Sequence, residues 1–318
     1  MGENPEIYIF SMMKVNAICI SNKRGIQKHK VDEAIFIEDF GIEGDAHAGK
    51  WHRQVSILNQ EAIDEFVSRG AEVFSGAFGE NLIVSGLDLE NLPMRSLLKI
   101  GDVILEKTQK GKECHSHCQI YHKMGECIMP KLGTFFEVRK GGKVKIGDEI
   151  IIMENPDKRF VAAVITLSDR SFNKEREDIS GPTIVNKLKE NDYIIAEEIL
   201  LPDNKAMLKN ELIRLSDQRE VDLILTTGGT GFSAKDITPE ATLEVIDRNA
   251  PGIAEAIRYE SLKITKNAML SRGVSGIRKH TLIINLPGSP KACVESMDVF
   301  LNTLPHALKL LKGEKVDK

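Results

Sequence analysis

The pattern of apolar and polar positions differs between the two halves of the chain. In the first half, short apolar runs alternate with glycine-containing turns, and one amphipathic helix is predicted at about residues 59–68. Many short strands with few helices are typical of a β-barrel-like domain. The predicted strands cover residues 15–20, 55–58, 82–84, 103–106, 135–138 and 150–153.

The second half alternates strands with helices. Strands are predicted at residues 161–167, 193–200 and 221–225, and helices after Ser180-Gly181-Pro182 and at residues 205–215. This rhythm predicts right-handed crossovers and a mostly parallel sheet with helices on both faces, a three-layer α/β fold. A polar segment broken by proline separates the halves, so we predict one domain over residues 1–155 and a second over residues 156–318.

Composition narrows the class of protein. A length of 318 residues suits two domains, and 42% hydrophobic with 28% charged residues is typical of a soluble protein. No apolar run is long enough to span a bilayer and no secretory signal is evident, so we expect a cytoplasmic protein without membrane partners. A net charge of -4 with mixed signs argues against nucleic acid as a partner.

The loop after the strand at residues 221–225 carries the clearest chemical signal. Its glycines, in Thr227-Gly228-Gly229-Thr230-Gly231, let backbone N–H groups face an anion, and Thr238-Pro239-Glu240 predicts a helix start with Thr238 as N-cap and Pro239 first in the helix. The spacing matches neither the dinucleotide fingerprint nor the P-loop. A tight strand-to-helix connection would also explain the glycines, but Asp236 beside a phosphate-binding loop suggests Mg²⁺.

Further polar segments follow the other predicted strands of this half. Because the carboxyl ends of parallel strands meet at one edge of a sheet, we expect these segments to converge. Ser180 and Asp203 also have structural readings, since either residue could cap the helix that follows it. Two anion loops, two carboxylates and an arginine suit the joining of two phosphate-bearing reactants around a metal. The segments are Ser168-Asp169-Arg170, Asp203, Ser271-Arg272 and Asn285-Leu286-Pro287-Gly288.

Four of these motifs, in this order, resemble the molybdopterin-binding family of molybdenum cofactor biosynthesis. Within it the resemblance is greatest to the molybdopterin adenylyltransferases, which activate molybdopterin with Mg-ATP before molybdenum insertion. The motifs are residues 226–231, residues 235–241, residues 268–272 and residues 285–288.

The resemblance implies a role for each matching residue. Asp203 and Asp236 would be catalytic, handling Mg²⁺ and orienting the α-phosphate of ATP, which the phosphate of molybdopterin attacks in line with loss of pyrophosphate. Lys235 stands where the family often has arginine, so we expect altered phosphate affinity. The implied cofactor-binding residues are Ser168, Gly228, Gly229, Thr230, Gly231, Ser271, Arg272, Asn285, Pro287 and Gly288.

The first half resembles the MOSC domain of molybdenum cofactor sulfurases and related proteins, over roughly residues 12–153. The motifs that carry this resemblance are residues 44–58, 78–82, 100–102 and 142–148. The resemblance implies that the domain binds the cofactor or carries sulfur on a cysteine. Cys114 is the best match for that cysteine, placed to coordinate molybdenum or to bear a persulfide.

The neighbouring cysteines and histidines leave alternatives open. Cys114, Cys118 and Cys127 with His117 could form a tetrahedral zinc site or a redox pair, or they could be inert. A lone histidine in a glycine-rich loop is more often hydrogen-bonded than functional. The residues concerned, which could also line a pocket, are His47, Trp51 and His52.

Both resemblances point to one pathway, and the sequence therefore predicts a fusion protein acting in molybdenum cofactor assembly. The expected ligands are molybdopterin, Mg²⁺ and ATP, and the expected partners are other assembly proteins. The resemblance also implies a homo-oligomer, a trimer or a multiple of one. The alternative is a non-catalytic protein that binds and delivers molybdopterin or the finished cofactor, and the choice of molybdenum or tungsten stays open.

Overall fold

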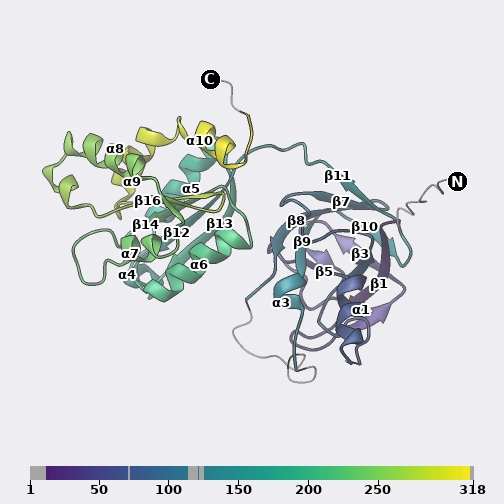
Figure 1. Cartoon of the computed structure of the whole chain (residues 1–318). Coiled ribbons are helices and arrows are strands. Elements are labelled where there is room, and N and C mark those ends of the chain that lie inside the picture. Colours follow the sequence, from purple (N-terminus) through teal and green to yellow (C-terminus); the bar gives the residue numbers. More distant parts are fainter. Residues whose placement is uncertain (1–11, 71, 114–120, 122–124, 316–318) are drawn as a thin grey trace, which may run out of the picture. The chain divides into compact units, whose positions relative to one another are not determined.

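The computed structural model describes residues 12–70, 72–113, 121 and 125–315. The chain divides between Pro156 and Asp157 into two compact units (Figure 1), here named the N-terminal unit and the C-terminal unit. Among the described helices, none combines the length and the apolar character needed to cross a bilayer.

The N-terminal unit is rich in β-sheet, as predicted. Its larger sheet has the strand order β11-β7-β8-β9-β5-β6-β1-β2, and a smaller one has the order β10-β3-β4. All described pairings are antiparallel except that of β5 with β6. The elements are β1 (Lys14–Ile20), β2 (His29–Val31), β3 (Glu33–Ile37), β4 (Gly41–Ile42), β5 (Val55–Asn59), α1 (Gln60–Ser68), β6 (Leu82–Ser85), β7 (Leu97–Ile100), β8 (Val103–Lys110), α3 (Met129–Leu132), β9 (Thr134–Lys140), β10 (Gly142–Lys145) and β11 (Ile150–Met153).

The two ends of the larger sheet approach each other without a continuous ladder. Within the described residues, one isolated bridge joins Lys14, in β1, to Glu149, just before β11. The sheet-rich character is thus confirmed, whereas closure into a barrel stays a prediction.

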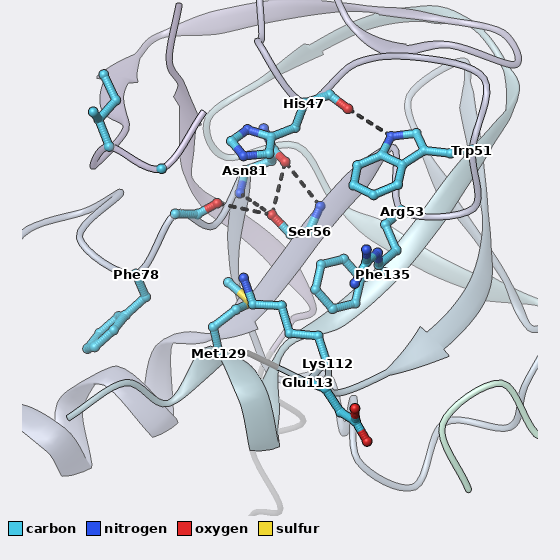
Figure 2. Close-up of a pocket in the computed structure, with 13 residues that line it drawn as sticks. His47, Trp51, Arg53, Ser56, Phe78, Asn81, Lys112, Glu113, Met129 and Phe135 are labelled. Atoms are coloured by element: carbon cyan, nitrogen blue, oxygen red, sulfur yellow. Dashed lines mark hydrogen bonds between the residues drawn. The ribbon is translucent and has the colours of Figure 1, made fainter. Parts of the chain in front are cut away.

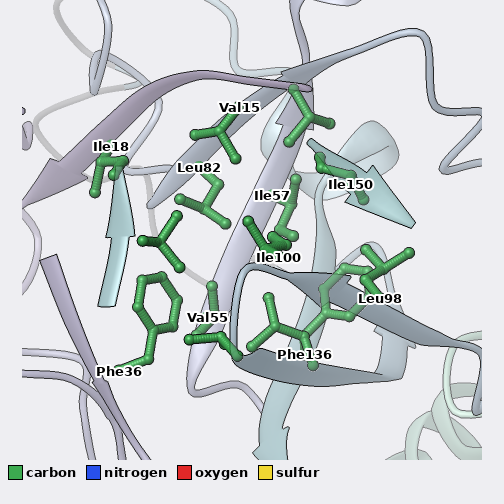
Figure 3. Packing of buried hydrophobic residues seen from close by; sticks show 14 of the residues in the cluster. Val15, Ile18, Phe36, Val55, Ile57, Leu82, Leu98, Ile100, Phe136 and Ile150 are labelled. Carbon is green, nitrogen blue, oxygen red and sulfur yellow. The ribbon is translucent and has the colours of Figure 1, made fainter. Parts of the chain in front are cut away.

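Alternation along the strands divides the side chains of the N-terminal unit between two cores. Val55 and Ile57 face the larger core, which Figure 3 shows, whereas Leu58 faces a second cluster. The apolar face of α1, through Ile63 and Phe66, covers that second cluster. Because the side chains of a strand alternate in direction, both faces of β5 are buried.

The C-terminal unit is an α/β fold around a mixed sheet with the order β13-β12-β14-β17-β16-β15. The first four strands are parallel, and β16 and β15 extend the sheet by antiparallel pairing. The elements are β12 (Val161–Leu167), α4 (Asp169–Phe172), α5 (Ser180–Glu190), β13 (Ile194–Leu201), α6 (Lys205–Asp217), β14 (Leu223–Thr227), α7 (Thr238–Leu243), β15 (Arg248–Asn249), α8 (Pro251–Leu262), the 3-10 helix η1 (Lys266–Leu270), β16 (Ser275–Arg278), β17 (Thr281–Leu286), α9 (Pro290–Phe300) and α10 (Leu304–Leu311).

Helices cover both faces of this sheet, as predicted (Figure 1). Val164 packs in a core with α5, α8, α9 and α10, and its neighbour Ile165 packs in a core with α6 and α7. Every residue of β14 and β17 is buried. This burial explains the continuous apolar character of the central strands and leaves the loops at their carboxyl ends for ligands.

Candidate functional site

The first glycine loop follows β14 and depends on glycine for its shape. Gly228 and Gly229 have φ of +94° and +63°, in the region that favours glycine. A Cβ atom on Gly228 would lie 2.3 Å from the carbonyl oxygen of Leu167, and one on Gly229 would lie 2.5 Å from Oγ1 of Thr238. Both positions therefore exclude a side chain, and the loop packs directly on the carboxyl end of β12.

The start of α7 secures this loop in a way that differs from the prediction. Thr238 is the first helical residue and Ile237 is the N-cap, so Pro239 is the second residue of the helix. The Thr238 hydroxyl donates to the carbonyl of Gly228 at 2.8 Å, and its N–H donates to the carbonyl of Gly229 at 3.1 Å. The predicted N-cap was wrong because the hydroxyl serves the glycine loop instead of a helical N–H.

The second glycine turn lies against the first. A Cβ atom on Gly288 would lie 3.5 Å from the Cα atom of Gly228. The hydroxyl of Thr227 donates to the carbonyl of Pro287 at 2.7 Å, and that of Ser180 donates to the carbonyl of Gly288 at 3.0 Å. The first bond joins the two predicted anion loops, and the second joins the second glycine turn to the start of α5.

Ser180 also departs from the predicted N-cap role. It is the first residue of α5, whose N-cap is Ile179. The carboxylate of Asp178 accepts from the N–H groups of Ser180 and Gly181 at 3.0 and 3.1 Å. Asp178 therefore satisfies the helix start, which leaves the Ser180 hydroxyl for the second glycine turn.

Asn285 is a buried junction beneath the loops. Its amide donates to the hydroxyls of Thr226 and Thr242, both at 2.9 Å, and its Oδ1 atom accepts from the N–H of Val274 at 3.2 Å. Only 4% of the residue is exposed. The side chain thus joins β14, α7 and the segment before β16.

Arg272 holds the first glycine loop with its whole guanidinium. Nε donates to the carbonyl of Gly231 at 2.6 Å, Nη2 donates to the carbonyl of Asp236 at 2.5 Å, and Nη1 pairs with Glu240. The predicted contact of this fork with a phosphate stays a prediction. The structure assigns Arg272 a loop-holding role that its partners define.

Carboxylates from three segments converge at the same edge. Burial raises the pKa of Asp203, and the nearby charges of Asp169 and Asp236 add to that increase. The alternative role of Asp203 as a helix cap is taken by Asn204, which accepts from the N–H of Met207 at 3.0 Å. Oδ2 of Asp203 accepts from the N–H of Asp169 at 3.2 Å, which leaves Oδ1 for a ligand.

The donor set suits a magnesium ion shared with a substrate. Within the described residues, no group of three or more His, Cys, Asp or Glu side chains is placed to hold a metal ion. Mg²⁺, however, usually keeps several waters and takes only one or two protein carboxylates together with substrate phosphates. The charge of Asp236 is one of the causes that raise the pKa of Asp203, so two carboxylates are near each other at this edge, and Oδ2 of Asp236 accepts from the N–H of Ser233 at 2.7 Å.

The two predicted serines lie at this edge and are half-buried. Ser168 caps α4 by accepting from the N–H of Ser171 at 3.2 Å. The hydroxyl oxygen of Ser271 accepts from the N–H of Gly273 at 3.4 Å. Both hydroxyls also have a hydrogen to donate, so each could still contact a ligand.

A second candidate site is a cavity of about 280 Å³ in the N-terminal unit (Figure 2). The guanidinium carbon of Arg53 lies 4.8 Å from the ring centre of Trp51 and 5.8 Å from that of Phe135. The indole N–H of Trp51 donates to the carbonyl of His47 at 2.8 Å. Aromatic rings and a stacked arginine therefore make one wall, and Lys112 adds a further cation to the lining.

A buried polar network joins the predicted motifs at residues 44–58 and 78–82 behind this cavity. The carboxylate of Asp45 accepts from Nζ of Lys28 at 2.8 Å, from Nδ2 of Asn81 at 3.0 Å and from the N–H of Ser21 at 3.1 Å. Burial opposes ionisation of Asp45, but hydrogen bonds and the Lys28 charge hold its pKa below the ordinary value. Asn81 also accepts from the N–H and the hydroxyl of Ser56, which lines the cavity.

Of the predicted pocket residues His47, Trp51 and His52, two line the cavity and one does not. His47 and Trp51 line the cavity, whereas Nε2 of His52 lies 2.8 Å from Oε1 of Gln109.

Of the cysteines for which a chemical role was predicted, Cys114 and Cys118 lie outside the described residues, as does His117. Cys127 is partly buried against the core cluster beside α1. The zinc, persulfide and redox hypotheses therefore stay predictions.

Two family models match the chain, one in each unit. Residues 163–306 match the probable molybdopterin binding domain, and residues 44–151 match the MOSC domain. The molybdopterin adenylyltransferase of Helicobacter pylori J99 is 40% identical over 153 residues, which cover 47% of this chain and 86% of that protein. The chain belongs to the molybdopterin-binding family and carries a MOSC domain.

Other relatives match about half of the chain. The molybdenum cofactor synthesis protein cinnamon of Drosophila melanogaster is 41% identical over 151 residues, and the match covers 46% of this chain and 25% of that longer protein. The structure of the molybdopterin biosynthesis enzyme MoaB from Thermus thermophilus is 45% identical, with a TM-score of 0.47, and covers 50% of this chain and 99% of its own.

Two residues with partners in these sites, Asp169 and Lys28, were not predicted as site residues. Asp169 contacts Asp203 through two hydrogen bonds and pairs with Lys235 at 2.7 Å. Lys28 is the buried partner of Asp45. The signal for Asp169 was its place directly after an apolar strand, whereas Lys28 lies in a polar segment that gave no signal.

Proposed function

We propose that the C-terminal unit transfers AMP from Mg-ATP to the terminal phosphate of molybdopterin. The observation that carries this proposal is the 40% identity to an adenylyltransferase across 86% of that relative's length. The convergence of both glycine turns with Asp203 and Asp236 at one sheet edge supports it.

Each group of residues has its own role in this proposal. The first glycine loop would hold the nucleotide phosphates with backbone N–H groups, and Ser168 and Ser271 would orient the pterin and its phosphate. Asp203 and Asp236 would hold Mg²⁺, which supplies charge neutralisation at the reacting phosphates. Because the phosphate of molybdopterin is itself the nucleophile, the chain contributes alignment and electrostatics, with no covalent intermediate on the protein.

The N-terminal unit would bind the cofactor or carry sulfur, in keeping with its MOSC domain. The cavity beside Trp51 offers aromatic surface for a pterin and the cations Arg53 and Lys112 for a phosphate. Trp51 is the single tryptophan of the chain, so its fluorescence would report binding there. We further propose that the protein acts in the cytoplasm as a homo-oligomer and exchanges its product with other assembly proteins.

A direct assay tests the catalytic proposal. Full-length protein is mixed with molybdopterin, Mg²⁺ and ATP labelled in the α-phosphate, and adenylylated molybdopterin is measured. Asp203→Asn and Asp236→Asn should each lose at least about 100-fold in kcat while still binding molybdopterin, because electrostatic groups of this kind contribute about 10²–10³-fold. Asp192→Asn is the matched control, since Asp192 is 81% exposed beside the amino end of β13.

Three outcomes are informative. Loss of product in the two site variants, with full activity in the control, supports adenylylation. Absence of product from the unchanged chain would refute it. If molybdopterin binds tightly while Mg-ATP leaves the melting temperature unchanged, the binding and delivery function is favoured, because a ligand that binds the native state raises its stability.

A further inference from the structure

We propose that Asp169 is a positioning residue that fixes the carboxylate of Asp203 toward the substrates, with Lys235 as its counter-ion. This inference rests on the proposed function of the C-terminal unit. It gives a role to a residue whose segment was expected at this edge but to which the family resemblance assigned none.

Asp169 and Asp203 form a reciprocal pair of hydrogen bonds. The N–H of Asp169 donates to Oδ2 of Asp203 at 3.2 Å, and the N–H of Asp203 donates to Oδ1 of Asp169 at 3.0 Å. The parallel ladder of β12 and β13 ends at Leu167 and Leu201, so this pair joins the chains just beyond it. Both the backbone and the carboxylate of Asp203 are therefore held.

The carboxylates of Asp169 and Asp203 differ in how many of their oxygens accept a hydrogen bond. Oδ2 of Asp169 accepts from Nζ of Lys235 at 2.7 Å, so both oxygens of Asp169 have partners. For Asp203, by contrast, no hydrogen bond within the described residues involves Oδ1. Asp203 therefore presents one oxygen to a ligand, whereas Asp169 would have to give up a bond to do so.

Lys235 connects this pair to the second catalytic candidate. It precedes Asp236 in the chain, and its ion pair with Asp169 draws the segment of Asp236 toward the end of β12. The Lys235 side chain is 72% exposed, and exposed ion pairs contribute little stability. The pair therefore sets the local arrangement and offsets one negative charge, without contributing much to folding.

A purely structural link between two strand ends predicts different behaviour from a positioning role. A structural link would affect the stability of the fold and substrate binding together. A positioning role affects kcat, because misplacing a reacting group by about 1 Å can cost about 100-fold in rate. The two readings separate when the hydrogen-bond acceptor is removed in one variant and kept in another.

The test compares Asp169→Ala with Asp169→Asn in the full-length protein. Alanine removes the acceptor for the N–H of Asp203, whereas asparagine keeps that acceptor and loses the hydrogen bond and ion pair with Lys235. We expect Asp169→Ala to lower kcat for adenylylation by about 10- to 100-fold with little change in the KM for ATP. Asp169→Asn should recover most of that loss, and Asp192→Asn is the charge-matched control.

A second readout does not depend on activity. Backbone amide exchange at Asp203, followed by NMR, should accelerate by about fivefold or more in Asp169→Ala, which corresponds to the loss of one hydrogen bond. Asp169→Asn should keep the protection of the unchanged chain. If the unchanged chain makes no adenylylated product, the proposed function fails, yet amide exchange still decides whether Asp169 holds Asp203.

Three results would overturn the positioning role. Equal loss in both variants with a raised Mg²⁺ requirement would make Asp169 a metal ligand itself. Unchanged kcat and unchanged amide exchange in Asp169→Ala would remove any role in holding Asp203. A fall in melting temperature with kcat preserved in the folded fraction would leave only a structural link.

Discussion

Replacing Asn285 should destabilise the C-terminal unit because its amide is fully used inside the protein. Asn285→Ala removes two donated hydrogen bonds, to Thr226 and Thr242, and one accepted from the N–H of Val274. At about 1 kcal/mol for each bond, the expected loss in the free energy of unfolding is about 3 kcal/mol. The change leaves polar groups buried, so the loss should not fall below about 2 kcal/mol.

Urea unfolding can locate this loss in one unit. Most described helical residues lie in the C-terminal unit, so circular dichroism at 222 nm follows that unit, whereas Trp51 fluorescence follows the N-terminal unit. With an m-value of about 2 kcal/mol/M, the dichroism midpoint should fall by about 1.5 M. The fluorescence midpoint should stay unchanged. Asn302→Ala, at an exposed position, should stay within about 0.5 kcal/mol of the unchanged chain.

One result would refute the reasoning. If Asn285→Ala keeps the dichroism midpoint and instead loses affinity for molybdopterin, the amide contacts the ligand, and the bonds to Thr226 and Thr242 are not essential. Loss of both midpoints together would show that the two units unfold as one, and amide exchange at Val274 would then measure the local effect.

Three further predictions address the loop, the buried ion pair and acid stability. Gly228→Ala should cost about 1–3 kcal/mol by urea unfolding, because φ of +94° disfavours a side chain and its Cβ atom would lie 2.3 Å from a carbonyl oxygen; Gly252→Ala, with open space around it, should be neutral or stabilising. Lys28→Met should cost about 3–5 kcal/mol in the Trp51 fluorescence transition, since it leaves Asp45 buried without its cation, and a loss below 1 kcal/mol would contradict this. Hydrogen bonds from two lysines lower the pKa of Glu244 to about 2. Its contribution to the free energy of unfolding is therefore complete above pH 4.5 and declines as the pH falls toward 2. Between pH 4.5 and pH 2, the dichroism midpoint of Glu244→Gln should vary less than that of the unchanged chain.

The central parallel strands of the C-terminal unit were predictable because burial on both faces produces continuous apolar runs. β12 and β14 gave such runs, and their order with the helices fixed the parallel core of the sheet. The edge strand β15 was not predicted, because it has only two residues, Arg248 and Asn249, and both are exposed. A strand of that length has no periodicity to detect, and tertiary pairing alone defines it.

The N-terminal unit shows the same limit in another form. Six of its strands were predicted, but β2, β3, β4, β7 and β10 were not. Most residues of β2, β3 and β10 are exposed or only partly buried, whereas β4 is buried but has only two residues, and β7 has only four, of which two are buried. The link between Asp45 and Asn81 was also beyond sequence reasoning. Each residue lies in its own motif, and the hydrogen bond that joins them spans 36 positions.

Within the candidate site, the motifs identified the right segments but not the hydrogen-bonding role of each side chain. Thr238 and Ser180 have the composition of helix caps, yet their hydroxyls bind carbonyls 10 and 108 positions away. Local preference describes only the neighbouring backbone, so it cannot detect such partners. The same holds for Arg272, whose guanidinium is suited to bind a phosphate but donates to carbonyl groups of the first glycine loop and of Asp236.

A loss of activity after substitution at these positions could therefore come from a collapsed loop or from a missing ligand contact. Stability measured in the same variant distinguishes them. At Asp203, asparagine keeps an oxygen that can accept from the N–H of Asp169, so Asp203→Asn should lose the ligand contact with little loss of stability.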